Sequence, residues 1–224
     1  MKIIWRGQSC FQLLGNSKRG DKPLSIVIDP FSEEVGFKLP KMEADILLVT
    51  HDHFDHNNVK GVFGVAGETP FLINAPGEYD VGGVFIQGIP SWHDDSKGKE
   101  KGQNIIYLIK TEELKICHLG DLGQKELSEK ELEEIGEVDI LMIPVGGDGA
   151  TLDAKDAAHI ISQIEPKIAV PMHYNLPKLK VKLDELDLFL RVMGKKEVQT
   201  EDKLNIKKKD LPEEGFQLIV LNQV

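Results

Sequence analysis

Short hydrophobic runs alternate with short polar segments along the first half of the chain, a pattern typical of β-strands. Lys2–Trp5 and Cys10–Leu14 lie on either side of Gly7 and predict a hairpin. Ser25–Asp29 and Ile46–Thr50 are compact and rich in β-branched residues, which favours buried strands with functional groups at their ends. Further strands are expected at Phe71–Asn74, Val81–Ile89, Asn104–Lys110 and Leu114–His118, the last two as a hairpin.

The second half mixes helical and extended patterns. Asp153–Ile164 places Ala and Ile residues at helical spacing, with Asp153 as its candidate N-cap. Lys125–Ile135 has helical composition, with a candidate cap at Ser128 and Glu131 three residues later. A further helix is expected at Leu179–Met193, and strands at Val138–Pro144, Ile168–Val170 and in the tail from Val198 to Val224. Helices and strands in this order predict a layered α/β or α+β fold.

A chain of 224 residues can bury roughly 70% of its unfolded surface around one core. The sequence has no repeat at a fixed period and no low-complexity linker. Ser96–Gly102 is expected to be a flexible loop inside the fold. We therefore expect a single domain over residues 1–224.

Lys plus Arg number 27 and Asp plus Glu number 37, so the formal net charge is −10 with histidine neutral. This balance argues against nucleic-acid binding, which needs clustered basic residues. No apolar stretch approaches the roughly 20 residues that span a bilayer, and the N-terminus lacks a secretory pattern. We therefore expect a cytoplasmic protein without a membrane partner. Cys10 and Cys117 make no disulfide framework and are expected to be buried.

Candidate metal ligands are concentrated directly after Ile46–Thr50, in the segment HDHFDH that spans His51–His56. If the chain stays extended, His51 and His53 point to the same side, because side chains repeat every two residues. A turn then brings Asp55 and His56 to a neighbouring point, so one segment can serve two metals. Imidazole with carboxylate suits zinc, and also manganese or iron. A merely solvated loop would hardly hold three of the chain's seven histidines.

This segment resembles the HxHxDH signature of the metallo-β-lactamase superfamily. The rest of the chain resembles that superfamily in its order, with His93 in PSWHD, Asp121 in HLGD and His173 in PMHY. APGEYDVGGVFI, PVGG and IAVPMHY are similar to a compact branch of Zn-dependent hydrolases that includes ascorbate-phosphate-lactonase-like proteins. The resemblance covers most of the chain, from Trp5 to His173.

The resemblance implies a four-layer αβ/βα sandwich with two divalent metal ions at one edge of its sheets. Zinc is the expected metal and manganese the alternative. A hydroxide shared by the two ions would then attack a small ester, lactone or phosphoester. The implied ligands are His51, His53 and His93 for one ion, Asp55, His56 and His173 for the second, and Asp121 as the bridge.

Other residues have two interpretations each. Tyr174 is either a hydrogen-bond donor to the developing oxyanion or a packed aromatic at the rim. Asp29 either orients a metal-binding histidine or serves a turn with Pro30. His118 is expected to be a core or outer-sphere residue and His159 to be structural. Gln8 stands where relatives often carry histidine, which puts the transfer of their activity in doubt.

The implied activity is a dinuclear metal-dependent hydrolase, with Asp55 and Tyr174 as its candidate catalytic residues. The alternative is a metal-binding protein of the same fold with little catalysis, acting in regulation or assembly. The interval from Asp121 to His173 is too short for the insertion of RNA-processing members, and the tail lacks a helical substrate domain. A small-molecule substrate is expected. Metal ions would make the mouth positive, which leads to the hypothesis of an anionic substrate. The sequence leaves homo-oligomerisation open.

Overall fold

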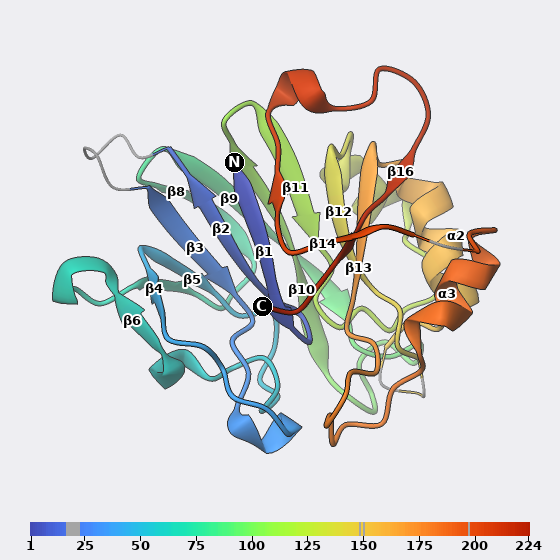
Figure 1. Ribbon diagram of the computed structural model, residues 1–224, viewed down its shortest axis with the longest axis horizontal. Coiled ribbons are helices and arrows are strands. Elements are labelled where there is room, and N and C mark those ends of the chain that lie inside the picture. The colour runs from blue at the N-terminus through green and yellow to red at the C-terminus, as the bar shows by residue number, and fades with distance from the viewer. Residues whose placement is uncertain (17–22, 148, 150, 197) are drawn as a thin grey trace.

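The computed structural model describes residues 1–16, 23–147, 149, 151–196 and 198–224, and within them two larger sheets face each other (Figure 1). The first sheet has the order β15-β1-β2-β3-β5-β7 and the second the order β16-β13-β12-β11-β10-β9-β8. The first contains β1 (Lys2–Gly7), β2 (Cys10–Gly15), β3 (Leu24–Ile28), β5 (Ile46–Leu48), β7 (Phe71–Ile73) and β15 (Leu204–Asn205). The second contains β8 (Gly77–Val81), β9 (Val84–Trp92), β10 (Gln103–Thr111), β11 (Leu114–His118), β12 (Ile140–Pro144), β13 (Ile168–Met172) and β16 (Gln217–Leu218).

The remaining elements are short. The small strand pairs are β4 (Met42–Ala44) with β6 (Val62–Gly64), and β14 (Thr200–Glu201) with β17 (Val220–Leu221). The α-helices are α1 (Glu129–Ile135), α2 (Ala154–Ile164) and α3 (Leu186–Val192), and the 3-10 helices are η1 (Glu33–Val35), η2 (Val59–Gly61), η3 (Val65–Gly67) and η4 (Lys208–Asp210). None of the helices in the described ranges is long and apolar enough to cross a membrane.

The core lies between the two sheets. Its largest buried side chains include Trp5, Phe11 and Tyr107, which are at most 1% exposed. The Tyr107 hydroxyl shares its single proton across the core between the carbonyls of Val49 (2.9 Å) and Ile73 (3.0 Å). A buried hydroxyl with two partners avoids the cost of lost hydration. Tyr107 therefore ties the second sheet to the strand ends of the first.

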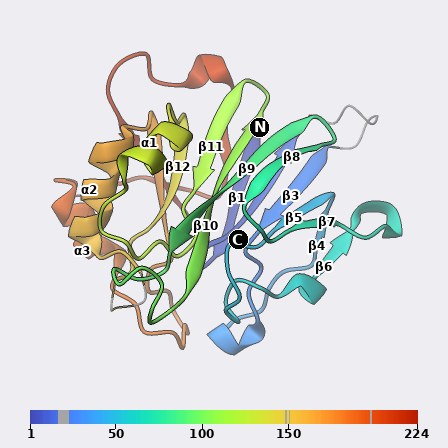
Figure 2. The same ribbon diagram turned by 180° about the vertical axis from the view of Figure 1, so that it is seen from behind.

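Different elements cover the two outer faces (Figures 1 and 2). The helices lie beside the second sheet, where Ala157, Ile160 and Ile164 are the buried face of α2. The outer face of the first sheet is covered by a second apolar cluster, which includes Phe31 and Val35 and involves η1, β4 and β6. The mixed α/β sandwich predicted from the sequence is confirmed, and short 3-10 turns form the outer layer of the first sheet in the described residues.

Several predicted elements and caps are confirmed, although α1 begins at Glu129 and not at Lys125. Asp153 caps α2 by accepting the backbone N–H groups of Lys155 and Asp156. Ser128 and Glu131 form a capping box at the start of α1. The predicted hairpin of β10 and β11 is also present.

Two predicted elements were wrong. Val81–Ile89 is not one strand, because Gly82 and Gly83 adopt positive φ values of 63° and 86° and turn the chain between β8 and β9. The helix predicted at Leu179–Met193 is limited to α3. Leu179 and Val181 instead pack against the cluster around η1, and this alternation has the period of extended chain.

Candidate metal centre

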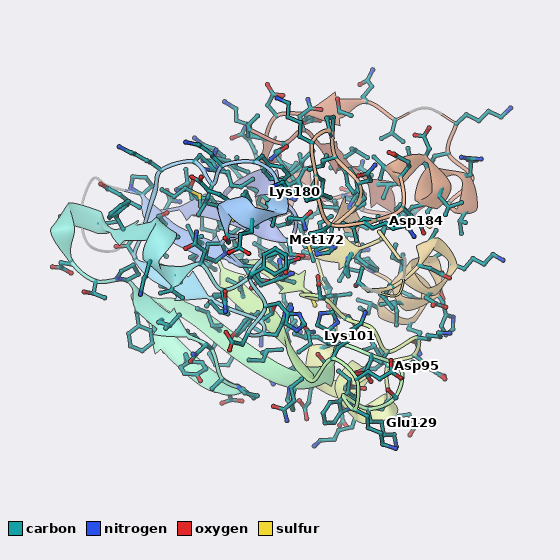
Figure 3. The ribbon with its side chains drawn as sticks, turned by 90° about the horizontal axis from the view of Figure 1, so that it is seen from below. Asp95, Lys101, Glu129, Met172, Lys180 and Asp184 are labelled. Atoms are coloured by element: carbon teal, nitrogen blue, oxygen red, sulfur yellow. The ribbon has the colours of Figure 1, made fainter. Side chains whose placement is uncertain are left out.

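The predicted ligands follow the carboxyl ends of four strands. His93 follows β9, Asp121 follows β11 and His173 follows β13, and these three strands run in the same direction within the second sheet. The segment His51–His56 follows β5 of the first sheet. The Thr50 carbonyl accepts the N–H of Ile105 in β10 (3.0 Å), so the chain crosses from one sheet to the other just before the histidine segment. Figure 3 views this edge, with Met172 at the end of β13 between Lys180 and Lys101.

The side chains gather into two adjacent sets. We call His51, His53 and His93 the histidine set, and Asp55, His56, Asp121 and His173 the mixed set. Within each set, one ligand atom from every residue lies within 4.8 Å of the others. Asp121 Oδ2 lies 3.2 Å from His56 Nε2, 3.2 Å from His173 Nε2 and 3.5 Å from His93 Nε2. The Asp121 carboxylate therefore lies between the two sets.

Asp29 orients one histidine of each set. Its Oδ2 lies 2.9 Å from His56 Nδ1, and it also accepts the Thr50 hydroxyl at 2.7 Å. Thr50 Oγ1 in turn lies 3.0 Å from His51 Nδ1. Because the Thr50 proton goes to Asp29, His51 Nδ1–H donates to Thr50 and the His51 Nε2 lone pair is free, while the contact of Asp29 with Nδ1 turns His56 Nε2 toward the centre. Of the two interpretations of Asp29, the geometry favours the orienting role.

The turn between β1 and β2 holds the two carboxylates. The Ser9 hydroxyl donates to Asp121 Oδ1 (3.3 Å) and the Gln8 amide Nε2 donates to Asp55 Oδ2 (3.5 Å). Asn104 Oδ1 accepts the backbone N–H of Asp121 at 3.0 Å. The sequence reasoning missed Thr50, Ser9 and Asn104, since ordinary polar residues in strands and turns carry no ligand pattern. Of the three, only Thr50 could have been suspected from the sequence, because it directly precedes the histidine segment.

Three of the nine non-glycine residues with positive φ in the described ranges lie at the same place. Gln8, Asp29 and His173 are non-glycine residues with φ of 50°, 48° and 52°. Such left-handed conformations persist where the surrounding structure enforces them, and they cluster at functional sites. Gly120 has φ 58°, and a Cβ there would come within 2.3 Å of Asn104 Oδ1. The loop that carries Asp121 therefore requires glycine at this position.

Burial and charge set the protonation of the centre. Burial lowers the pKa of His51 well below its usual value, and neighbouring His56 adds to that shift. Burial alone would raise the pKa of Asp121, but His173 and His56 outweigh it and hold that pKa below its usual range. Burial alone would lower the pKa of His56, but Asp121, Asp55 and Asp29 outweigh it and raise it. The buried carboxylates of the mixed set thus demand nearby positive charge.

A pair of divalent cations fits these residues. His51 and His56 both bury their Nε2 atoms: His51 Nε2 makes no hydrogen bond among the described residues, although buried nitrogens are normally paired, and His56 Nε2 faces Asp121 Oδ2 at 3.2 Å. Their Nδ1 atoms are held from outside the centre, as in metal-binding histidines. The donor atoms are imidazole nitrogens and carboxylate oxygens, which suit zinc and related ions.

The other singled-out residues lie outside the two sets. His118 is buried, with Nε2 2.9 Å from the Ser9 carbonyl, which fits the expected core role. His159 is exposed on α2. The Tyr174 ring packs on Trp5 with 5.0 Å between centroids, and burial raises the pKa of its hydroxyl. The catalytic role of Tyr174 stays a prediction. Cys10 and Cys117 are buried and free, as expected, and burial raises the pKa of Cys117 to about 12.

A cavity of about 490 Å³ opens beside His93. It lies between the loop after β9 and the segment before α2, and Gly147 is among its lining residues. Asp94 organises the first of these loops, because its carboxylate accepts the backbone N–H groups of Ser96, Gly98, Glu100 and Lys101 at 2.8–3.0 Å. The space suits a small molecule next to the metal centre.

Fold and site together define a metallo-β-lactamase-type protein, and comparison with known proteins agrees. The sequence profile of the beta-lactamase superfamily domain matches residues 2–173. The chain is 32% identical over 199 residues to a UPF0173 metal-dependent hydrolase of Thermococcus onnurineus, covering 78% of this chain and 85% of the relative. The chain therefore belongs to the metallo-β-lactamase superfamily and, within it, to the UPF0173 metal-dependent hydrolases.

Solved structures show the same architecture. A Thermotoga maritima protein described as a Zn-dependent hydrolase of the metallo-beta-lactamase superfamily has a TM-score of 0.75 and 32% identity, with 98% of both chains covered. An isothiocyanate hydrolase from Delia radicum gut bacteria has a TM-score of 0.65 at 14% identity, covering 92% of this chain and 99% of that one. The second likeness shows the fold alone.

Proposed function

We propose that this protein hydrolyses a small ester, lactone or phosphoester with two divalent metal ions, zinc in first place and manganese as the alternative. The observation that carries the proposal is the pair of adjacent ligand sets, with Asp121 between them and a small-molecule cavity beside them. The names of its relatives, metal-dependent hydrolases, support the same reaction type.

The histidine set would hold one ion, and Asp55, His56 and His173 the second, with Asp121 bridging. When bound, the ions supply a water-derived nucleophile at neutral pH and positive charge for the substrate oxygen. Asp29 keeps His56 and, through Thr50, His51 in the tautomer that presents Nε2. Ser9 and Gln8 hold the carboxylates of Asp121 and Asp55, so these ligands are oriented before substrate arrives.

A substrate in the cavity would lie beside the histidine set, because His93 is among the lining residues. Its lining carries two basic residues, Lys101 and Lys125, and five acidic ones, Asp94, Asp95, Glu100, Asp153 and Asp156. Positive charge for an anionic substrate would therefore come from the ions and these two lysines. The preference for an anionic substrate stays a hypothesis, and a matched series of anionic and neutral esters tests it.

The experiment is an assay of the protein loaded with Zn²⁺ or Mn²⁺ on lactone, phosphodiester and carboxylic-ester panels, with Asp55→Ala as the control. We expect turnover by the wild-type protein on at least one panel and none above background by the variant. Elemental analysis of the same samples should give about two ions per wild-type chain. Wild-type rates equal to those of Asp55→Ala on every panel would contradict hydrolysis, even if both ions are present.

A further inference from the structure

The turn Gly7–Ser9 contacts three members of the mixed set, Asp55, Asp121 and His173. The Gln8 carbonyl accepts the backbone N–H of His173 at 3.2 Å and the indole N–H of Trp5 at 2.8 Å. Both backbones are in left-handed conformations, with φ of 50° at Gln8 and 52° at His173. These contacts fix the backbone of Gln8 against a proposed ligand, and its side chain is 0% exposed.

The orientation of the Gln8 amide follows from the charge it faces. Its Nε2 donates to Asp55 Oδ2 (3.5 Å), the same oxygen that lies 3.4 Å from His173 Nε2. A carboxylate only accepts hydrogen bonds, so the NH2 group and not the oxygen must face Asp55. The other end of the amide, Oε1, is buried and makes no hydrogen bond within the described part of the chain.

A buried carbonyl oxygen without a donor is rare, because losing its hydration carries an uncompensated cost. The residues that line the cavity beside His93 do not include Gln8, so a substrate held there would not meet Oε1 directly. Oε1 belongs to the same amide group as the Nε2 that faces Asp55, so a water molecule bound in the metal centre would be a donor within its reach. Such a water could donate to Gln8 Oε1 and would lie next to the Asp55 carboxylate.

We propose that Gln8 is a positioning residue of the metal centre: its amide N–H holds Asp55 for the second ion, and its Oε1 accepts a hydrogen bond from the water that attacks the substrate. The first part concerns metal binding alone. The second part rests on the proposed function, because it assigns the water its role in hydrolysis.

The test compares Gln8→Met with Gln12→Met. Methionine fills nearly the same volume as glutamine but offers neither the donor nor the amide acceptor. Gln12 lies in β2, is also buried, and its side chain binds Ser25 and Arg6 rather than the centre. We expect Gln8→Met to weaken the second Zn²⁺ by about ten- to a hundredfold in a chelator competition, with Gln12→Met within about twofold of wild type.

Two further variants separate hydrogen bonding from packing. Gln8→His restores one N–H donor and one acceptor nitrogen, so we expect it to recover zinc affinity to within about threefold. Gln8→Asn keeps the amide but shortens its reach, and it carries the test if Gln8→Met is insoluble. With saturating Zn²⁺ and an active panel substrate, Gln8→Met should lower kcat by about tenfold and leave KM unchanged. Visible absorption of the Co²⁺-loaded proteins should differ between Gln8→Met and Gln12→Met.

Wild-type zinc affinity and kcat in Gln8→Met and Gln8→Asn would overturn the proposal, and so would equal losses in Gln8→Met and Gln12→Met. If the wild-type protein hydrolyses nothing but Gln8→Met still loses zinc affinity, the proposed hydrolysis fails and the placement of Gln8 at Asp55 stands. If the wild-type protein is active and both Gln8 variants match it, hydrolysis stands and the role of Gln8 fails.

Discussion

The histidine set and the mixed set lie side by side but are built differently. The histidine set offers only imidazole groups, and His53 is partly exposed. Every member of the mixed set is buried, and two of its four side chains are carboxylates held by Ser9 and Gln8. Asp29 contacts the mixed set directly and reaches the histidine set only through Thr50. The fold therefore orients one set more tightly than the other, and we expect the two proposed ions to differ in affinity and role.

The largest effect is expected from Asp121→Ala, because Asp121 lies between both sets. The rate of hydrolysis should fall by more than roughly 100-fold, which is the loss expected when only a hydrogen-bond partner of a ligand is removed. Elemental analysis should show a loss at both sets, whereas His53→Ala should lose one ion and keep the mixed set filled. Equal metal loss in Asp121→Ala and His53→Ala would remove the distinction between the sets.

Removing the ions should also lower stability, because ions that bind only the folded chain stabilise it by mass action. At a free ion concentration near 100 times Kd, one occupied site raises the free energy of unfolding by about 2.7 kcal/mol. For a chain of this length that corresponds to a fall in Tm of roughly 5–10 °C on chelation. Differential scanning calorimetry with and without chelator measures it. A Tm insensitive to both chelator and added Zn²⁺ would contradict the predicted sites.

A smaller loss of metal affinity should distinguish the two contacts of Asp29, the direct one with His56 and the one with His51 through Thr50. Asp29→Asn should weaken the ion of the mixed set by about ten- to a hundredfold, because Asp29 orients His56 directly. Thr50→Val removes only the bridge to His51 and should weaken the ion of the histidine set instead. Stepwise Zn²⁺ titration with a chelating indicator resolves both constants. Weaker binding of the same ion in both variants would contradict the separate roles of these two contacts.

The smallest effect is expected at the cavity, away from both sets. Asp94→Ala removes the acceptor that holds the loop from Ser96 to Lys101. Because this loop lines the cavity, KM should rise about tenfold, equivalent to about 1.4 kcal/mol of binding, with kcat nearly unchanged. Steady-state kinetics on the best panel substrate check this, with metal content as the control. A fall in kcat with constant KM would place Asp94 in the chemistry instead.

Much of the centre was predictable because its chemistry is local. His51, His53, Asp55 and His56 fall within six residues, and the structure divides them between two sets as the resemblance implied. Their roles as ligands remain a proposal, and so does the single domain over residues 1–224. The caps of α1 and α2 were also readable, since a cap depends on residues three apart.

The elements that were mispredicted depended on distant partners. Leu179 and Val181 have a composition compatible with helix, but they lie outside α3 and pack against the cluster around η1. Gly82 and Gly83 were read as part of a strand, although their positive φ values end it. In both cases a local pattern allowed two conformations, and packing or backbone geometry selected one.

By itself, the sequence determined the kind of ligand atoms and the order in which they follow strands, because residue type and strand periodicity are local properties. Only the tertiary structure decided which oxygens and nitrogens meet. Asp121 lies 3.3 Å from Ser9, although 112 residues separate them in the chain. The parallel ends of β11 and β13 and the crossing at Thr50 bring these groups to one edge. Outer partners such as Thr50, Ser9 and Gln8 acquire their roles there, since a hydrogen bond depends on distance in space and not in sequence.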